Sequence, residues 1–202
     1  MDKKILVTGC AGFIGYHLSN ALISENYEVI GVDSINNAYD TKFKEKRLEG
    51  LNNSDNFVFL NKDLNNQKSI EELNEYKIST IYHMAARAGV RDSFLDPKSY
   101  ITDNTNVTLN ISNYCKSNDV NELIIASTSS IYGDSGENLM IEDKDEKINP
   151  PSVYATTKLA GESLSKNILE NSNTNLIIAR FFTVYGPFGR PDMSILRFIH
   201  WI

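Results

Sequence analysis

The feature that most constrains the fold is a glycine-rich turn between a short apolar run and an amphipathic segment. The run ends at Val7, and Gly9, Gly12 and Gly15 follow at intervals of three residues. The first glycine permits a tight turn, the second lets backbone N–H groups approach a diphosphate, and the third lets helix and strand pack closely. A helix is expected to follow directly over Phe13–Glu25, so the spacing indicates a dinucleotide-binding strand–turn–helix unit.

Apolar runs and helical periodicity alternate along the rest of the chain. This alternation predicts an α/β fold, a doubly wound parallel sheet with right-handed crossovers. The expected strands are Lys3–Val7, Glu28–Val32, Phe57–Asn61, Thr80–His83, Glu122–Ser127 and Asn175–Ala179. The expected helices are Phe13–Glu25, Gln67–Glu75, Lys98–Ser117 and Val153–Asn171. The acidic segment 134–151 is expected to form a solvated loop.

Composition excludes several classes of protein. The chain has 202 residues, 41% of them hydrophobic, and no apolar run approaches the length of a membrane span. Its net charge of -6 offers no general attraction for nucleic acid. The cysteines Cys10 and Cys115 and three isolated histidines form no metal-binding pattern, so no metal is expected. We therefore expect a cytoplasmic protein without a membrane or nucleic-acid partner.

Further residues of the expected dinucleotide site follow other strands. Asp33 ends the second strand and could accept hydrogen bonds from ribose hydroxyls, or it could act as an ordinary helix cap. Its charge would repel a 2′-phosphate, which favours NAD over NADP. Asp63 and Leu64 could border an adenine pocket, or Asp63 could be a simple cap, while Ala85 and Ala86 leave room for a cofactor.

A second constellation combines hydroxyl groups with an ammonium group. Tyr154 and Lys158 are four residues apart on one expected helix, and Thr128, Ser129 and Ser130 follow the fifth strand. An adjacent ammonium and a nicotinamide cation would favour the phenolate of Tyr154, which could then remove a hydroxyl proton. Thr128 could hydrogen-bond that oxygen, although alone it could equally satisfy the backbone.

Together these residues resemble the extended short-chain dehydrogenase/reductase superfamily. Three stretches, Gly31–Asp40, Ala85–Arg91 and Arg180–Met193, are similar to NAD-dependent nucleotide-sugar 4-epimerases, most closely those that act on UDP-glucuronate. The resemblance implies a UDP-sugar substrate whose C4 is inverted through a transient 4-keto intermediate while NAD stays bound. Relatives that dehydrate or decarboxylate such sugars carry acidic residues at the positions of Ser129 and Ser130, so elimination is not expected here.

The resemblance assigns roles residue by residue. The implied catalytic residues are Thr128, Tyr154 and Lys158. The implied cofactor-binding residues are Gly9, Gly12, Phe13, Ile14, Gly15, Asp33, Asp63, Leu64, Ala85, Ala86, Tyr154 and Lys158. The implied substrate-binding residues are Arg91, Thr128, Ser129, Ser130, Thr183 and Arg190. For Arg87, Arg91 and Arg190 a solvated surface position is an equally good interpretation, and Arg180 is expected to be structural.

The chain is shorter than members of this family. Residues 1–185 are therefore expected to form an NAD-binding Rossmann domain, and 186–202 the start of a truncated substrate-binding region whose smaller C-terminal domain is largely missing. By resemblance, a homodimer is expected through Lys98–Ser117 and Val153–Asn171. Two alternatives stay open: a 4-epimerase of UDP-glucose or UDP-N-acetylglucosamine, and a non-catalytic NAD-binding module. Activity of the chain itself is also left open.

Overall fold

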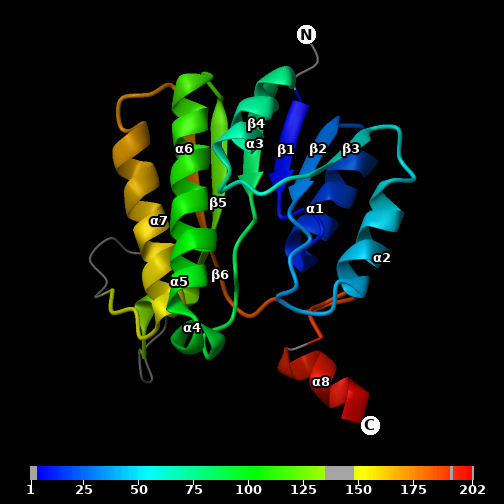
Figure 1. Cartoon of the computed structure of the whole chain (residues 1–202), viewed down its shortest axis with the longest axis vertical. Coiled ribbons are helices and arrows are strands. Elements are labelled where there is room, and N and C mark those ends of the chain that lie inside the picture. Colours follow the sequence, from blue (N-terminus) through cyan, green and yellow to red (C-terminus); the bar gives the residue numbers. More distant parts are fainter. Residues whose placement is uncertain (1–3, 135–147, 192, 202) are drawn as a thin grey trace.

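The computed structural model describes residues 4–134, 148–191 and 193–201 and contains one parallel sheet (Figure 1). The strands follow the order β3-β2-β1-β4-β5-β6, which confirms the predicted doubly wound topology. Their bounds are β1 Lys4–Thr8, β2 Val29–Asp33, β3 Phe57–Asn61, β4 Ile78–His83, β5 Glu122–Thr128 and β6 Asn175–Phe181. Most of the acidic segment predicted as a loop, 135–147, lies outside the described residues.

Helices cover both faces of this sheet. The helices are α1 Phe13–Ser24, α2 Lys42–Leu51, α3 Gln67–Glu72, α4 Asp92–Leu95, α5 Pro97–Tyr100, α6 Val107–Ser117, α7 Val153–Leu169 and α8 Ser194–Trp201. On one face, α1 and α2 enclose a cluster that includes Val7, Leu51 and Phe57. On the other, α3, α6 and the end of α7 pack over Leu6 and Ile81. Among the described residues, no helix is long and apolar enough to cross a bilayer.

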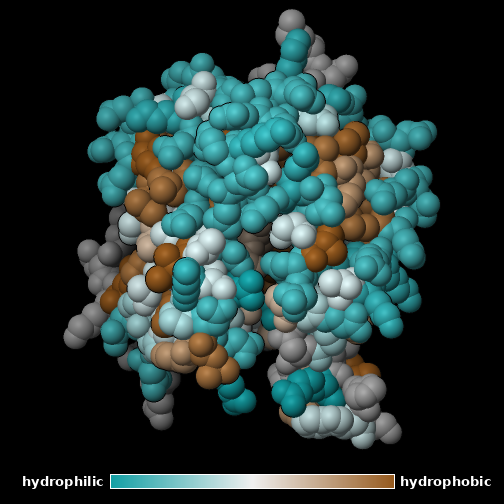
Figure 2. Space-filling model, viewed as in Figure 1, coloured by the Kyte–Doolittle hydropathy of each residue, from teal (hydrophilic) through white to brown (hydrophobic). Residues whose placement is uncertain are grey.

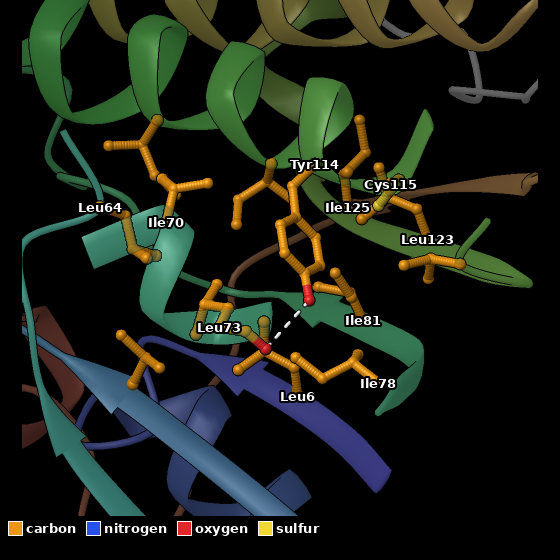
Figure 3. Close-up of a cluster of buried hydrophobic side chains, with 14 of the residues drawn as sticks. Leu6, Leu64, Ile70, Leu73, Ile78, Ile81, Tyr114, Cys115, Leu123 and Ile125 are labelled. Atoms are coloured by element: carbon orange, nitrogen blue, oxygen red, sulfur yellow. Dashed lines mark hydrogen bonds between the residues drawn. The ribbon is translucent and has the colours of Figure 1, made fainter. Parts of the chain in front are cut away.

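The larger core cluster lies between β1, β4, β5 and the helices α3 and α6 (Figure 3). Leu6 pairs in register with Ile30 on one side and Ile81 on the other, and all three are almost fully buried. The Tyr114 hydroxyl in α6 donates a hydrogen bond to the carbonyl oxygen of Leu73 at 3.1 Å. This bond lets a polar atom reach the interior without remaining unsatisfied.

Several helical features differ from the sequence prediction, among them the additional helices α4 and α8, and two of the differences bear on the site. Helix α2 was not predicted, because the buried face of Lys42–Leu51 carries two cations, Lys44 and Arg47, beside its leucines. The single helix expected over Lys98–Ser117 is instead divided, since Ile101–Asn106 forms a π-helix. That wider turn brings the Asn104 side chain to the backbone of Arg87, from which it accepts a bond of 2.7 Å.

Surface chemistry follows from this layering. Polar side chains cover much of the face seen in Figure 2, and apolar patches lie between them.

All strands are parallel, so their carboxyl ends share one edge of the sheet. The candidate site residues that follow β1, β2, β4 and β5 therefore meet at that edge.

The core makes a direct prediction about stability. Replacing Ile81, which has no exposed surface in the central strand β4, with alanine should lower the free energy of unfolding by about 2–5 kcal/mol. The matched control is Ile177→Ala in β6, where the side chain is 41% exposed, and it should cost about 1 kcal/mol or less. Urea unfolding of both variants measures the difference. Equal losses would contradict the placement of β4 at the centre of the core.

Candidate active site

A cleft of about 440 Å³ opens at the carboxyl edge of the sheet. It is bordered by the glycine turn after β1, by the ends of β2, β4 and β5, and by the segment after β6. Of the site residues predicted from sequence, these line the cleft: Gly9, Gly12, Phe13, Ile14, Gly15, Asp33, Asp63, Leu64, Ala85, Ala86, Thr128, Ser129, Ser130, Tyr154, Lys158, Thr183 and Arg190. Arg91 does not line it, because its side chain is exposed at the start of α4.

The glycine turn packs too closely for side chains. Gly9 has a φ of +69°, and a Cβ atom there would lie 2.7 Å from the backbone nitrogen of Ala85. A Cβ at Gly15 would lie 2.1 Å from the carbonyl oxygen of Gly9. The backbone N–H of Ala85 also donates to the Thr8 hydroxyl at 3.1 Å, which ties β4 to the turn. The first and third glycines are therefore needed for close packing.

The start of α1 suits an anionic ligand. Gly12 is the N-cap residue and provides no side chain to accept a hydrogen bond from the first turn. No acidic residue lies in that first turn either. The first backbone N–H groups of a helix lack intrahelical partners, so they and the helix dipole can bind a diphosphate.

Asp33 meets a cation that the sequence analysis missed. Its Oδ1 accepts a bond from the backbone N–H of Ile35 at 2.9 Å, and Lys44 Nζ lies 3.5 Å away. Lys44, buried in α2, also donates to Asn36 Oδ1 at 3.0 Å. The spacing of Lys44, Arg47, Leu48 and Leu51 could have revealed this helix, but two of its four buried positions are charged.

Asp63 lines the same part of the cleft without capping a helix. Its Oδ1 accepts the backbone N–H of Asn65 at 2.9 Å, which forms a local turn. The N-cap of α3 is Asn66, whose side chain accepts from the backbone N–H of Lys68. The cap considered for Asp63 in the sequence analysis is therefore supplied by Asn66 instead.

Tyr154 and Thr128 approach each other from two elements. Ser152 caps α7 by accepting the backbone N–H of Ala155 at 3.1 Å, which places Tyr154 in the first turn of the helix. Thr128 ends β5, and its side chain hydrogen-bonds Tyr154. Burial raises the pKa of the Tyr154 phenol, whereas this hydrogen bond and the charge of Arg190 act in the opposite direction. Arg190 is thus a cation that favours the phenolate and that the sequence analysis did not assign to this role, and the role expected for Lys158 stays a prediction.

Lys158 lies one helical turn further along α7 and is buried. Burial lowers the pKa of its ammonium group to about 8, and the charge of Glu162 opposes this shift. Glu162 is itself buried and is held by Arg180, whose Nη2 lies 2.8 Å from the carboxylate. Ser127 donates a further hydrogen bond to Glu162. The carboxylate is therefore largely committed to Arg180 and Ser127.

Hydroxyl groups that follow β5 and β6, and the cation Arg190, also line the cleft. Ser129 and Ser130 open a 3-10 turn directly after β5, and Thr183 follows β6. The Arg190 guanidinium lies over the Tyr39 ring at 5.6 Å and donates to the carbonyl of Ala88 at 3.4 Å. These are neutral donors and a cation, a combination suited to an anionic ligand.

His83 is a buried part of the scaffold. Its ring nitrogens lie 2.7 Å from the Thr8 hydroxyl and 3.0 Å from the Thr108 hydroxyl. Burial lowers its pKa to about 3, so the imidazole is neutral at physiological pH. Among the described residues, no group of three or more histidine, cysteine or acidic side chains could hold a metal ion.

Comparison with known families adds to this geometry. Residues 5–202 match the NAD dependent epimerase/dehydratase family. The chain belongs to this family. NAD is the cofactor of the family, and the glycine turn and the uncapped start of α1 are an arrangement that a dinucleotide fits.

Individual members of the family resemble the chain closely. A UDP-glucuronate 4-epimerase from Thermodesulfobacterium geofontis is 44% identical over 198 residues, covering 98% of this chain and 61% of the relative. The crystal structure of a UDP-glucuronic acid 4-epimerase from Bacillus cereus, in complex with UDP-glucuronic acid and NAD, aligns with a TM-score of 0.88 and 38% identity, covering 97% of this chain and 62% of that one.

A more distant match acts on a different sugar. A UDP-N-acetylglucosamine 4-epimerase from Methanobrevibacter ruminantium aligns with a TM-score of 0.81 and 29% identity, covering 96% of this chain and 59% of that one. The chain thus spans about three fifths of the length of the relatives it matches.

The role of the glycine turn in NAD binding can be tested by adding one methyl group at Gly15. Gly15→Ala should lower NAD affinity at least about tenfold, because the new Cβ would lie 2.1 Å from the Gly9 carbonyl and force the turn to shift. Gly50→Ala in α2 is the control, since its nearest neighbour would be 3.4 Å away. Calorimetric titration with NAD compares the three proteins. Unchanged affinity in Gly15→Ala would exclude this turn as the dinucleotide site.

The buried ammonium should be visible in stability measurements. An ammonium whose pKa falls from 10.5 to about 8 on folding destabilises the fold below pH 8, and the penalty disappears as pH rises to 10.5. Lys158→Met should therefore be more stable than wild type at pH 7 by up to about 3 kcal/mol, and the difference should shrink above pH 8. Lys166→Met, which removes an exposed lysine of the same helix, should show no such pH dependence. Denaturant unfolding between pH 7 and 10 measures both differences, and a constant gap would refute the shifted pKa.

Proposed function

We propose that this protein acts as an NAD-dependent 4-epimerase of UDP-glucuronate. The observation that carries the proposal is that Thr128, Tyr154 and Lys158 line the same cleft as the glycine turn. A protein that only bound NAD would have no use for a phenol hydrogen-bonded to a threonine beside that turn. We propose residues 1–185 as the cofactor-binding domain, with the rest of the chain beginning the substrate-binding part.

The described residues offer suitable partners to the diphosphate and to the adenosine half of NAD. We assign the diphosphate to the glycine turn and the start of α1, the adenosine ribose to Asp33 and Lys44, and the adenine to Asp63 and Leu64. When bound, NAD would accept a hydride from C4 of the sugar and would return it to the opposite face of the 4-ketone, so that no net oxidation results. Asp33 favours a free 2′-hydroxyl, since its carboxylate would repel a phosphate there.

Tyr154 acts as the base and then the acid of the proposed reaction. Its phenolate removes the proton of the C4 hydroxyl as the sugar is oxidised, and its phenol returns a proton to the oxygen after the ketone has turned. Thr128 donates a hydrogen bond that favours the phenolate, and the positive charge of Arg190 supports it. Lys158, with a pKa of about 8, is mostly protonated at pH 7 and adds positive charge to the site.

The substrate assignment depends on the hydroxyl groups that follow β5 and β6 and on Arg190. Ser129, Ser130 and Thr183 line the cleft and could donate hydrogen bonds to the sugar carboxylate, while Arg190 supplies a charge. The side chains of Ser129 and Ser130 lack the carboxyl group that would move a proton at C5, which disfavours elimination of water. Arg91 receives no support as a substrate ligand from its exposed position.

A second candidate is 4-epimerisation of UDP-N-acetylglucosamine or UDP-glucose. The alignment with the Methanobrevibacter ruminantium UDP-N-acetylglucosamine 4-epimerase favours keeping this alternative. A panel of UDP-sugars separates the two, because an enzyme that binds the uronate carboxylate should lose activity when the carboxylate is absent.

Assembly as a homodimer through α6 and α7 stays a prediction, which analytical ultracentrifugation can check.

Removal of the phenol oxygen of Tyr154 tests the proposed mechanism. Tyr154→Phe should reduce interconversion of UDP-glucuronate and UDP-galacturonate by about 100-fold or more, the usual contribution of a general acid–base group, while NAD binding changes little. The assay uses the longest form of the protein that expresses, with product followed by chromatography. Tyr27→Phe, on a tyrosine that is 49% exposed, is the control and should keep wild-type turnover.

The outcomes separate the parts of the proposal. Turnover that survives in Tyr154→Phe would remove this residue from the mechanism. A wild-type protein that binds NAD and interconverts other UDP-sugars, but not UDP-glucuronate, would support the second candidate.

A further inference from the structure

The segment Gly186–Arg190, here called the strap, crosses the carboxyl edge of the sheet. It follows β6 at one end of the sheet and runs toward the other end (Figure 1), where residues 187–189 contact α1 and α2. His17 in α1 lies 2.8 Å from the carbonyl of Pro187, and the rings of Tyr16 and Phe188 are 5.3 Å apart. The strap therefore connects the end of β6, near the proposed substrate ligand Thr183, to the proposed cofactor half.

Arg47 in α2 is the main polar attachment of the strap. Its side chain has no exposed surface. Nε donates to the carbonyl of Phe188 at 3.1 Å, and Nη2 donates to the same carbonyl at 2.7 Å and to that of Gly189 at 3.1 Å. Nη1 donates to the carbonyl of Ala11 at 2.9 Å and to the Tyr39 hydroxyl at 2.7 Å. These five bonds match the five N–H donors that a guanidinium has.

The partners of this guanidinium are unusual for a buried charge. All are carbonyl or hydroxyl oxygens, and none of these hydrogen bonds goes to a carboxylate. A buried cation normally requires an ion-pair partner, because taking it out of water is costly. One of the bonded carbonyls belongs to Ala11, inside the glycine turn. The charge of Arg47, which forms no ion pair with any residue in the described ranges, therefore lies against the turn that we assign to a diphosphate.

The strap is held in a conformation that it would not favour by itself. Phe188 has a φ of +57°, which is rare for a bulky residue and requires support from its surroundings. Two of the five Arg47 bonds go to the carbonyl of this residue. Loss of the guanidinium would remove both and leave the strap free to relax.

We infer that Arg47 is a positioning residue that couples the cofactor turn to the strap, an inference that rests on the proposed function. The strap provides three of the five bonds that hold the guanidinium in place, so the charge stays at the turn only while the strap is docked. An anion bound at the turn therefore stabilises the docked strap more than the released one. The strap ends at Arg190, so docking also fixes a proposed substrate ligand.

Coupling of this kind is reciprocal and can be measured from both sides. In wild type, saturating NAD should slow chymotryptic cleavage of the strap after Phe188, whose side chain is 45% exposed, by about tenfold. In Arg47→Met, which keeps an apolar side chain but removes the guanidinium, NAD should leave the cleavage rate nearly unchanged. By linkage, NAD affinity of this variant should fall by about the same tenfold factor. Lys46→Met removes an exposed cation of the same helix and should behave as wild type.

A merely structural role would give a different result. In that case Arg47→Met would lower the melting temperature and speed cleavage of the strap, but NAD would still slow this cleavage about as much as in wild type. An unchanged effect of NAD on cleavage in this variant would overturn the inference. Wild-type protein that binds NAD without any change in strap cleavage would also overturn it while leaving the proposed function intact. Wild-type protein that does not bind NAD in calorimetry would instead overturn the proposed function, and the inference with it.

A second measurement covers the case in which Arg47→Met does not fold. The Gly189 N–H donates to the Gly186 carbonyl at 3.2 Å within the strap, so its hydrogen exchange reports on strap release. In wild type, NAD should slow exchange in the peptide that contains Gly189 by about tenfold, and Arg47→Lys, which keeps the charge but cannot make all five bonds, should reduce this effect. Exchange that is insensitive to NAD in wild type would overturn the inference.

Discussion

The close approach of three backbone segments at the glycine turn is the constraint on which the cleft depends. Gly9 lies against the backbone of Ala85, and Gly15 lies against the carbonyl of Gly9, so β1, α1 and β4 meet with no room for a Cβ atom. This contact aims the start of α1 into the cleft and brings the loop after β4 alongside it. The other elements of the site then follow from the order of the strands, because β5 and β6 add their carboxyl ends to the same edge.

Burial determines the electrostatics of the catalytic side of the cleft. It disfavours the charged forms of both Tyr154 and Lys158, and Glu162, whose charge opposes the shift at Lys158, is already paired with Arg180. A free carboxylate in that position would hold the ammonium more firmly charged. The fold therefore tolerates a poorly compensated lysine beside a phenol, an arrangement that costs stability and is typical of functional sites.

Much of this architecture could be predicted from the sequence. Runs such as Phe57–Asn61 are apolar on both faces, and the glycine spacing is interpretable without coordinates, so the parallel, doubly wound sheet and the dinucleotide-type turn could be predicted. Helix α2 was not, because Lys44 and Arg47 occupy buried positions whose partners are distant carbonyl and carboxylate groups. Sequence spacing likewise carries no information on whether a residue such as Arg91 faces the cleft or the solvent, since that depends on how the loop after β4 folds.

The buried imidazole of His83 sets a limit on the conditions that the fold can withstand. Held between Thr8 and Thr108, it has no room for hydration when it acquires a proton, and its pKa falls to about 3 from a usual value of 6.5. An unfolded chain takes up that proton at mildly acidic pH, whereas the folded chain resists it. Acidification below pH 6.5 therefore favours the unfolded chain progressively until about pH 3. The junction of β1, β4 and α6 is thus a built-in point of acid sensitivity, at the centre of the sheet and directly behind the glycine turn.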